Sequence, residues 1–273
     1  MSKNVSRAEN QQETHLKMGI LRDYTSDTIR FSPELATLLA FLFTDGGVSK
    51  HGVESWRIYF TNSSLSAIKL FVKCMTNIFG IASKRIQVKK RYGIHFIARV
   101  TSKEIGKYLV DTFGTFRTLR FEDGSYPSTR LPLDELIKSN LIPSFLRVVF
   151  SIDGGVKFYA GKESNGKYSL RKNVCLACYH PILREQYCFL IKKLGIDAAN
   201  IHADNVIRIQ GEKSVRAFAE NIGFIKGVTV TNHSRFWVGK EKNEVLRCLL
   251  ESYENPRHFL KLFTNSNDIV RTA

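Results

Sequence analysis

The feature that most constrains the fold of this chain is an internal repeat. An apolar segment ends in Asp-Gly-Gly-Val twice, as LLAFLFTDGGV at 38–48 and as LRVVFSIDGGV at 146–156. Two further pairs of segments follow in the same order: IFGIASKRIQV (78–88) with KLGIDAANIHA (193–203), and TSKEIGKYLVDTFG (101–114) with GEKSVRAFAENIG (211–223). Repeated order of this kind indicates one structural unit present twice. We therefore expect a duplicated domain within the 273 residues.

Each copy has the periodicity of a helix, two strands, a helix, two strands and a helix. In the first copy Ser32 and Pro33 are typical of a helix start, and Gly46 and Gly47 are expected to stop that helix. We predict strands at 56–61, 85–90 and 95–100, a tight turn at Arg91, Tyr92 and Gly93, and a helix at 65–79. In the second copy we predict a helix from Pro143 to Gly154 and Gly155, strands at about 157–160, 173–178, 200–203 and 206–210, a helix at about 181–194, and a longer loop at 164–173.

These elements divide the chain into five parts. We expect a polar N-terminal arm at 1–30, a first repeat at 31–120, a linker at 121–142, a second repeat at 143–263 and a loose tail at 264–273. The longest apolar stretch, at 35–43, is too short to cross a bilayer, and Met1 opens a polar segment, so neither a membrane partner nor a secretory signal is expected. Five scattered cysteines favour free thiols in a reducing intracellular compartment.

The charge of the chain indicates a polyanionic partner. It has 41 Lys and Arg against 25 Asp and Glu, a formal net charge of +16. Each phosphate that Lys or Arg neutralises releases condensed counterions, which favours binding to nucleic acid. The alternative is a basic surface that is simply solvated.

Asp45 and Asp153 are the strongest candidates for chemistry. Each ends an apolar helix, where the negative end of the helix dipole disfavours a carboxylate. If the two helices pack side by side, each carboxylate also raises the pKa of the other. A divalent cation removes both penalties, and Mg²⁺ prefers such oxygen ligands together with phosphate oxygens and water. The pattern favours metal-assisted phosphodiester hydrolysis; the alternative is that each Asp-Gly only forms a turn.

The segments LLAFLFTDG (38–46) and LRVVFSIDG (146–154) resemble the two motifs of single-chain LAGLIDADG homing endonucleases, over about residues 31–263. The resemblance implies an α+β fold of pseudo-twofold duplicated αββαββα repeats, with two curved antiparallel sheets forming a DNA-binding saddle. It also implies paired motif helices, and a metal site made by Asp45, Asp153 and the backbone near Gly46 and Gly154. Phe43 and Ser151 replace the first acid of the motif, and Ala40 and Val148 replace its small central glycine.

The same resemblance implies an activity. We expect a monomeric, sequence-specific endonuclease that cuts both strands of double-stranded DNA at a long asymmetric site and leaves short 3′ overhangs. Mg²⁺ would be the cofactor, Mn²⁺ would substitute for it, and Ca²⁺ would support binding without cleavage. Because the chain opens with Met and ends in Arg-Thr-Ala, we expect a free-standing or intron-encoded protein rather than an intein.

Two further residues are catalytic candidates. The segment FTNSSLSAIKLF (60–71) resembles a region where a polar residue orients water near the metal, which implies that role for Asn62. The local repeat alignment places Cys178 at the equivalent position, so the two halves are expected to be unequal. Lys157, four residues after Asp153, is a candidate for stabilising charge on the transferring phosphate; the alternative is a lysine that faces DNA or solvent.

Strand alternation gives each half a polar face that suits the major groove of DNA. Residues 84–91 contain five basic side chains and no acid. The candidates for DNA contact are Arg57, Tyr59, Lys84, Arg85, Gln87, Lys89, Arg91, His95 and Arg99 in the first half, and Lys172, His202, Asp204, Arg208 and Gln210 in the second. The alternative is a half-exposed sheet with polar residues in water. Because the two sets differ, we expect an asymmetric target.

Other signals are weaker. Cys175, Cys178, His180 and Cys188 include one Cys-x-x-Cys, but on a strand positions three apart face opposite sides, so a zinc site is not expected. Two other functions compete with the nuclease: an RNA maturase with the same fold, which binds its own intron RNA, and a transcription regulator derived from the family. The regulator would normally have lost Asp45 and Asp153.

Overall fold

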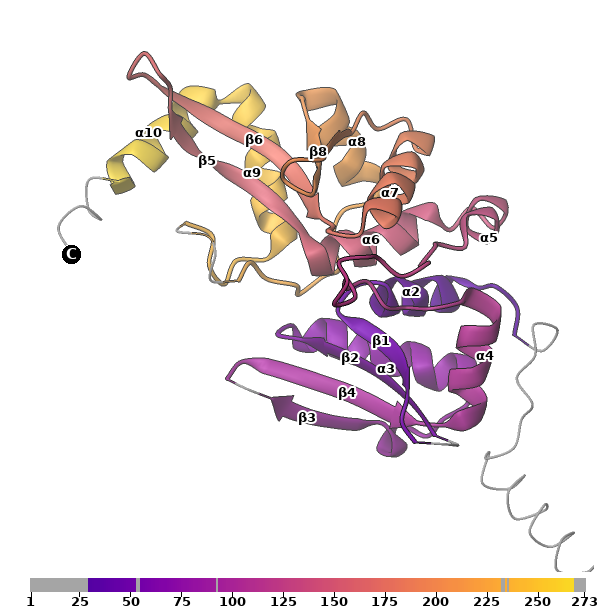
Figure 1. Ribbon diagram of the computed structural model, residues 1–273. Helices are drawn as coiled ribbons and strands as arrows, with labels where there is room; N and C mark the ends of the chain where they lie inside the picture. The colour runs from indigo at the N-terminus through magenta and orange to yellow at the C-terminus, as the bar shows by residue number, and fades with distance from the viewer. Residues whose placement is uncertain (1–28, 53–54, 92, 232–233, 235, 268–273) are drawn as a thin grey trace, which may run out of the picture.

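The chain forms two halves of like architecture that meet through a pair of helices (Figure 1). The structure is a computed structural model, and it describes residues 29–52, 55–91, 93–231, 234 and 236–267. Most of the predicted arm at 1–30 and the turn residue Tyr92 lie outside the described residues.

The first half follows the order helix, two strands, helix, two strands, helix. Its elements are α2 (Pro33–Leu42), β1 (Gly46–Lys50), β2 (Trp56–Asn62), α3 (Leu65–Phe79), the short 3₁₀ helix η1 (Ser83–Arg85), β3 (Gln87–Arg91), β4 (His95–Thr101) and α4 (Lys103–Phe113). The side chains of Ser32 and Ser64 cap α2 and α3 by accepting hydrogen bonds from backbone N–H groups three residues later. The strands form an antiparallel sheet in the order β1-β2-β4-β3.

The second half repeats that order and then adds two helices. Its elements are α6 (Ile142–Asp153), β5 (Gly154–Lys162), β6 (Tyr168–Ala177), α7 (Pro181–Lys193), β7 (Ala199–Ile201), β8 (Val206–Gln210) and α8 (Glu212–Asn221), followed by α9 (Lys242–Glu254) and α10 (Pro256–Asn267). Its sheet has the equivalent antiparallel order β5-β6-β8-β7. The predicted duplicated αββαββα fold is therefore confirmed.

The structure corrects several predicted boundaries. Helix α2 ends at Leu42, so Gly46 and Gly47 begin strand β1 instead of stopping the helix. The extra residues at 164–173 mostly lengthen the β5–β6 hairpin, because 168–173 belong to β6. The segment 121–142 contains a short helix, α5 (Leu133–Lys138). Residues 264–267 of the predicted tail belong to α10.

Helices α2 and α6 pack against each other at the centre of the core. Ala36 and Ala40 on α2 and Val148 on α6 are fully or almost fully buried. Small side chains on α2 allow the two helices to approach closely, and the bulkier Val148 is also accommodated. This packing fixes the C-terminal ends of both helices, and so the position of the two aspartates.

Three expectations concern membranes, cysteines and clusters of metal ligands. No helix among the described residues is long and apolar enough to cross a membrane. All five cysteines are free thiols. Within the described ranges, no group of three or more His, Cys, Asp or Glu side chains is placed to hold a metal ion.

Candidate metal and nucleic-acid site

Asp45 and Asp153 come together where α2 and α6 end. Asp153 is the last residue of α6, and Asp45 lies in the turn between α2 and β1. Both residues line one cavity of about 710 Å³. The negative charge of Asp45 is one of the causes that raise the pKa of Asp153, so the two carboxyls are close enough to interact.

The site disfavours both negative charges when no cation is present. Burial, followed by the charge of Asp45, raises the pKa of Asp153 well above its usual range, and Lys242 opposes the shift. Burial also raises the pKa of Asp45, against a hydrogen bond from Asn62 and the charges of His95 and Lys242. The side chain of Asp45 reaches solvent whereas Asp153 is half-buried, so burial raises the pKa of Asp153 more than that of Asp45. Two such carboxylates fit a divalent cation, which stabilises both ionised forms.

Asn62 and Cys178 occupy equivalent positions in the two halves. Gly46 pairs with Phe60 and Gly154 pairs with Leu176, so the residues two positions after these partners, Asn62 and Cys178, correspond. The Nδ2 of Asn62 donates a hydrogen bond to Oδ2 of Asp45 at 2.9 Å. The thiol of Cys178 instead faces the carbonyl oxygen of His180 at 3.5 Å. Within the described ranges, only the first aspartate therefore has a side-chain amide that fixes its orientation.

Lys242 is a cation of the site that the sequence analysis missed. It begins helix α9, which follows the αββαββα elements of the second half, and it is only 8% exposed. Its Nζ donates hydrogen bonds to the carbonyl oxygens of Ser151 at 2.7 Å and Gly154 at 2.6 Å. Burial lowers the pKa of Lys242 to about 8, against the charges of Asp153, Cys175 and Asp45. The Gly154 carbonyl, which we predicted near the metal, thus already faces an ammonium group.

Lys157 takes a different position from Lys242. It lies exposed on β5 opposite Asn173, on the face of the sheet away from the core residue Phe158. Its charge acts on the Cys175 thiol, two residues from Asn173 on the same face. The side chain of Lys157 therefore lies on the open face of the sheet, and its predicted catalytic role stays a prediction.

In the first half, most candidates for DNA contact share the face of the sheet opposite the core. The strand pairing places Arg57, Tyr59, Gln87, Lys89, Arg91, His95 and Arg99 on that face. Nε of Arg99 donates a hydrogen bond to Oε1 of Gln87 at 2.9 Å across two strands. Arg85, predicted to begin a strand, lies with Lys84 in η1 instead, and both residues line a cavity of about 580 Å³ together with Arg57.

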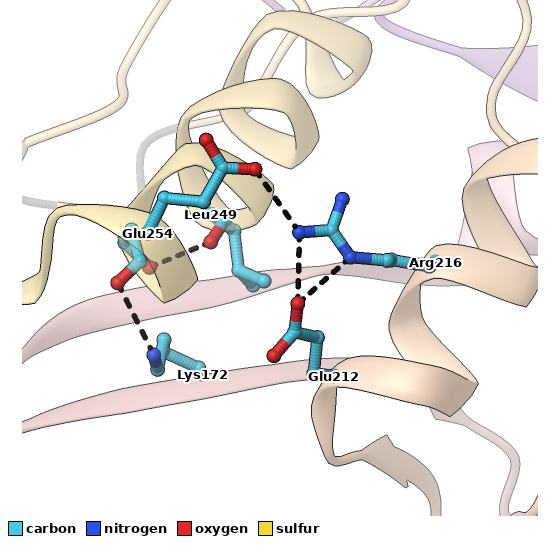
Figure 2. A network of polar contacts seen from close by, with 6 residues as sticks. Lys172, Glu212, Arg216, Leu249 and Glu254 are labelled. Carbon is cyan, nitrogen blue, oxygen red and sulfur yellow. Dashed lines mark hydrogen bonds and ion pairs between the residues drawn. The ribbon is translucent and has the colours of Figure 1, made fainter.

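In the second half, three candidates are misplaced by the sequence analysis. His202 and Asp204 lie in the turn between β7 and β8 instead of on a strand, and Asp204 forms an ion pair with Arg208 at 3.5 Å. Lys172 points to the core side of β6. Its Nζ lies 3.8 Å from the centre of the Tyr253 ring and donates to the Ser252 carbonyl, close to the Glu212–Arg216–Glu254 ion pairs (Figure 2).

The open face of the second sheet contains other polar side chains. Arg208 and Gln210 lie on it as predicted, and the same register adds Arg171 and Asn173 of β6 and Tyr159 of β5. The alternation would have identified Arg171 if strand β6 had been predicted to begin at 168 instead of 173. Each half therefore presents polar and basic side chains on the sheet face away from its helices.

No protein-family model matches the chain. Over 204 residues the chain is 26% identical to the replication factor C small subunit of Methanocaldococcus jannaschii, a match that covers 71% of this chain but only a tenth of that protein.

Solved structures of similar fold include two bound to DNA. The LAGLIDADG homing endonuclease I-SmaMI bound to cleaved DNA matches with a TM-score of 0.50 and 11% identity, over 87% of this chain and 94% of that one. The homing endonuclease I-WcaI bound to its DNA recognition sequence matches with a TM-score of 0.50 and 16% identity, over 75% and 86%. The chain has the LAGLIDADG homing endonuclease fold.

The LAGLIDADG fold accounts for the arrangement of the site. In this chain the two motif helices are α2 and α6, and the acids at their ends are Asp45 and Asp153. I-DmoI, another homing endonuclease, has been solved with DNA and Mn, with a TM-score of 0.45 and 16% identity over 71% of this chain and 97% of that one. At 11% and 16% identity, the matches to I-SmaMI and I-WcaI show the fold alone, and the activity has to be argued from the residues of this chain.

Proposed function

We propose that this protein is a metal-dependent, sequence-specific endonuclease of double-stranded DNA. One observation carries the proposal: two carboxylates from two equivalent helices meet in a single cavity, with open polar sheet faces in both halves. The net charge of +16 supplies the attraction to a polyanion. The difference between the two polar faces favours a long asymmetric target read by a monomer, with short 3′ overhangs as in the family that the motifs resemble.

Each residue of the site has a role in this proposal. Asp45 and Asp153 hold the divalent cation, Mg²⁺ or Mn²⁺, together with backbone near Gly46 and Gly154. A cation there supplies an activated water and polarises the scissile phosphate. Asn62 orients Asp45, and water beside it, through its amide. Lys242 and Lys157 place positive charge where negative charge develops on the phosphate.

A cleavage experiment tests the proposal. The purified chain is incubated with a supercoiled plasmid that carries the uninterrupted insertion site of its gene, in Mg²⁺, in Mn²⁺ and in Ca²⁺. We expect linear product in Mg²⁺ and Mn²⁺, and a retarded complex without cleavage in Ca²⁺. A plasmid with a scrambled site is the matched control. Absence of specific cleavage, with tight binding to the RNA of the surrounding intron, would replace the nuclease by the maturase.

A further inference from the structure

The two aspartates are held differently, although the halves share one fold. Asp45 accepts a hydrogen bond from the amide of Asn62, whereas Cys178 stands at the equivalent place beside Asp153. Among the described residues no side-chain hydrogen bond reaches the Asp153 carboxylate; Lys242 donates to neighbouring backbone carbonyls instead. Something other than residue 178 must orient Asp153 if both carboxylates are to hold the same geometry.

Tyr187 on α7 is the candidate for orienting Asp153. It is only 2% exposed, and its hydroxyl is buried with no hydrogen-bond partner in the part of the chain that the structure describes. Tyr187 lines the cavity that contains both aspartates and Cys178. Burial raises the pKa of Tyr187 well above its usual range, and the charges of Cys178 and Asp153 raise it further. Both groups therefore lie close enough to the phenol to interact with it. A buried unpaired hydroxyl is unusual in proteins and commonly indicates a bound water or ligand.

The first half has no hydroxyl at the matching position. Helices α3 and α7 are capped by Ser64 and His180, and the seventh residue after each cap is Phe71 in one and Tyr187 in the other. Phe71 is fully buried and packs against Phe41 and Phe60. The first half thus combines an amide at position 62 with a phenyl ring, and the second combines a thiol at position 178 with a phenol. The polar side chain therefore lies at the end of a strand in the first half and on a helix in the second.

We propose that Tyr187 is a positioning residue that orients the Asp153 carboxylate through one bridging water, as Asn62 orients Asp45 directly. A water is required because the Tyr187 hydroxyl makes no direct hydrogen bond. The shared cavity of about 710 Å³ is large enough to admit one, and Asp153 and Tyr187 both line it. The consequence for cleavage rests on the proposed function; the consequence for the metal-free protein does not.

The first test is thermal denaturation of the metal-free Tyr187→Phe variant. If the hydroxyl were simply unpaired, its removal would relieve an unsatisfied polar group and raise the melting temperature. If it binds a water shared with Asp153, its removal lowers the melting temperature. Tyr253→Phe is the matched control, because the Tyr253 hydroxyl is also buried without a partner but its ring lies at Lys172, away from the aspartates. A rise for Tyr187→Phe overturns the proposal.

The second test measures the cation and the two strands separately. Calorimetric titration with Ca²⁺ should show a weaker affinity for Tyr187→Phe, on the order of 10-fold, as is typical when a group that orients a metal ligand is lost. With each strand labelled in turn, one strand should be cut about 10-fold to 100-fold more slowly and the other at the wild-type rate. Adding Cys178→Asn, which copies the first half, should restore the slow strand.

These outcomes separate the two proposals. Unchanged Ca²⁺ affinity, or equal slowing of both strands, overturns the role of Tyr187 while leaving the nuclease intact. A wild-type protein that cuts no DNA overturns the nuclease, and the melting temperature and the Ca²⁺ titration still decide the role of Tyr187.

Discussion

Replacing Gly154 by alanine tests whether packing requires the first glycine of each Asp-Gly-Gly. A Cβ at Gly154 would lie 2.8 Å from the Phe150 carbonyl oxygen and 2.9 Å from the Cys175 carbonyl oxygen. Both atoms belong to the backbone, so either the last turn of α6 or strand β6 must move. Gly155 is the matched control, because a Cβ there would meet no atom within 4 Å. The first half agrees, since a Cβ at Gly46 would meet the Phe41 carbonyl oxygen at 2.5 Å.

The size of the effect follows from the cost of overpacking. Forcing an extra methyl group into a packed site costs about 1–3 kcal/mol. For a chain of this size, each kcal/mol lowers the melting temperature by about 2–4 °C, so we expect a loss of about 2–12 °C for Gly154→Ala. Gly155→Ala should change the stability by less than about 1 kcal/mol.

The assay is thermal denaturation followed by circular dichroism, with DNA cleavage as the second measurement. Because Asp153 directly precedes Gly154, a backbone shift displaces the carboxylate, and a misplacement of about 1 Å lowers the cleavage rate by about 10²-fold. The reasoning is refuted if Gly154→Ala and Gly155→Ala melt together and cut DNA at the same rate.

Four further predictions concern charge. Asp45→Asn or Asp153→Asn should abolish cleavage while DNA binding in Ca²⁺ survives, measured by gel retardation; retained cutting would refute the metal assignment. Since the pKa of both carboxyls is raised from 3.8 chiefly by burial, the metal-free fold binds their protons more tightly than the unfolded chain does. Its stability should therefore fall as the pH rises from about 4 through the raised pKa values, with a smaller fall in Asp153→Asn; equal urea-denaturation profiles for the two proteins would contradict this. Lys242→Met should slow cleavage by about 10²-fold with little change in DNA affinity, and full activity would exclude its role. Lys89→Ala should reduce the slope of log affinity against log salt by about 1, whereas Lys172→Ala, which faces the core side, should leave it unchanged.

The elements with strong local signals could be predicted from the sequence. Helix α3 was predicted at 65–79, where the structure has it, because Ser64 caps its start and Gly80 adopts the left-handed conformation at its end, with φ of 64°. The two aspartates were also found from the sequence, because each carries the same dipeptide of glycines after an apolar helix. Signals of this kind depend on neighbouring residues only, so the tertiary structure does not override them.

The errors arose where alternation of polar and apolar residues does not define a strand end. Polar and apolar residues alternate from Arg85 to Lys89, yet Arg85 belongs to η1 and the strand begins at Gln87. His202 and Asp204 continue the alternation of β7 into a turn, where Asn205 has a positive φ of 53°. The prediction for Lys172 failed differently, because its register in the lengthened hairpin turns the side chain toward α9.

Lys242 and Tyr187 could not be predicted because no local pattern marks them. Lys242 lies 89 positions after Asp153, on a helix that has no counterpart in the first half. From the sequence it is an ordinary exposed lysine, and it is buried only because α9 packs on β5. Tyr187 reads as one more apolar position of an amphipathic helix. The repeat alignment already set Cys178 opposite Asn62, but the significance of Tyr187 opposite Phe71 depends on the folded halves, where the Tyr187 hydroxyl is buried beside the aspartates.

The duplication supplies two carboxylates, but the charge balance of the site comes from the part that is not duplicated. With both aspartates ionised and Lys242 protonated, the centre has a net charge of −1 and repels a phosphate. A bound divalent cation turns this to +1, so the cation and a polyanion each favour the binding of the other. Converting one aspartate to asparagine removes the repulsion as well as a metal ligand. This is why we expect such a variant to keep its affinity for DNA while losing the ability to cut it.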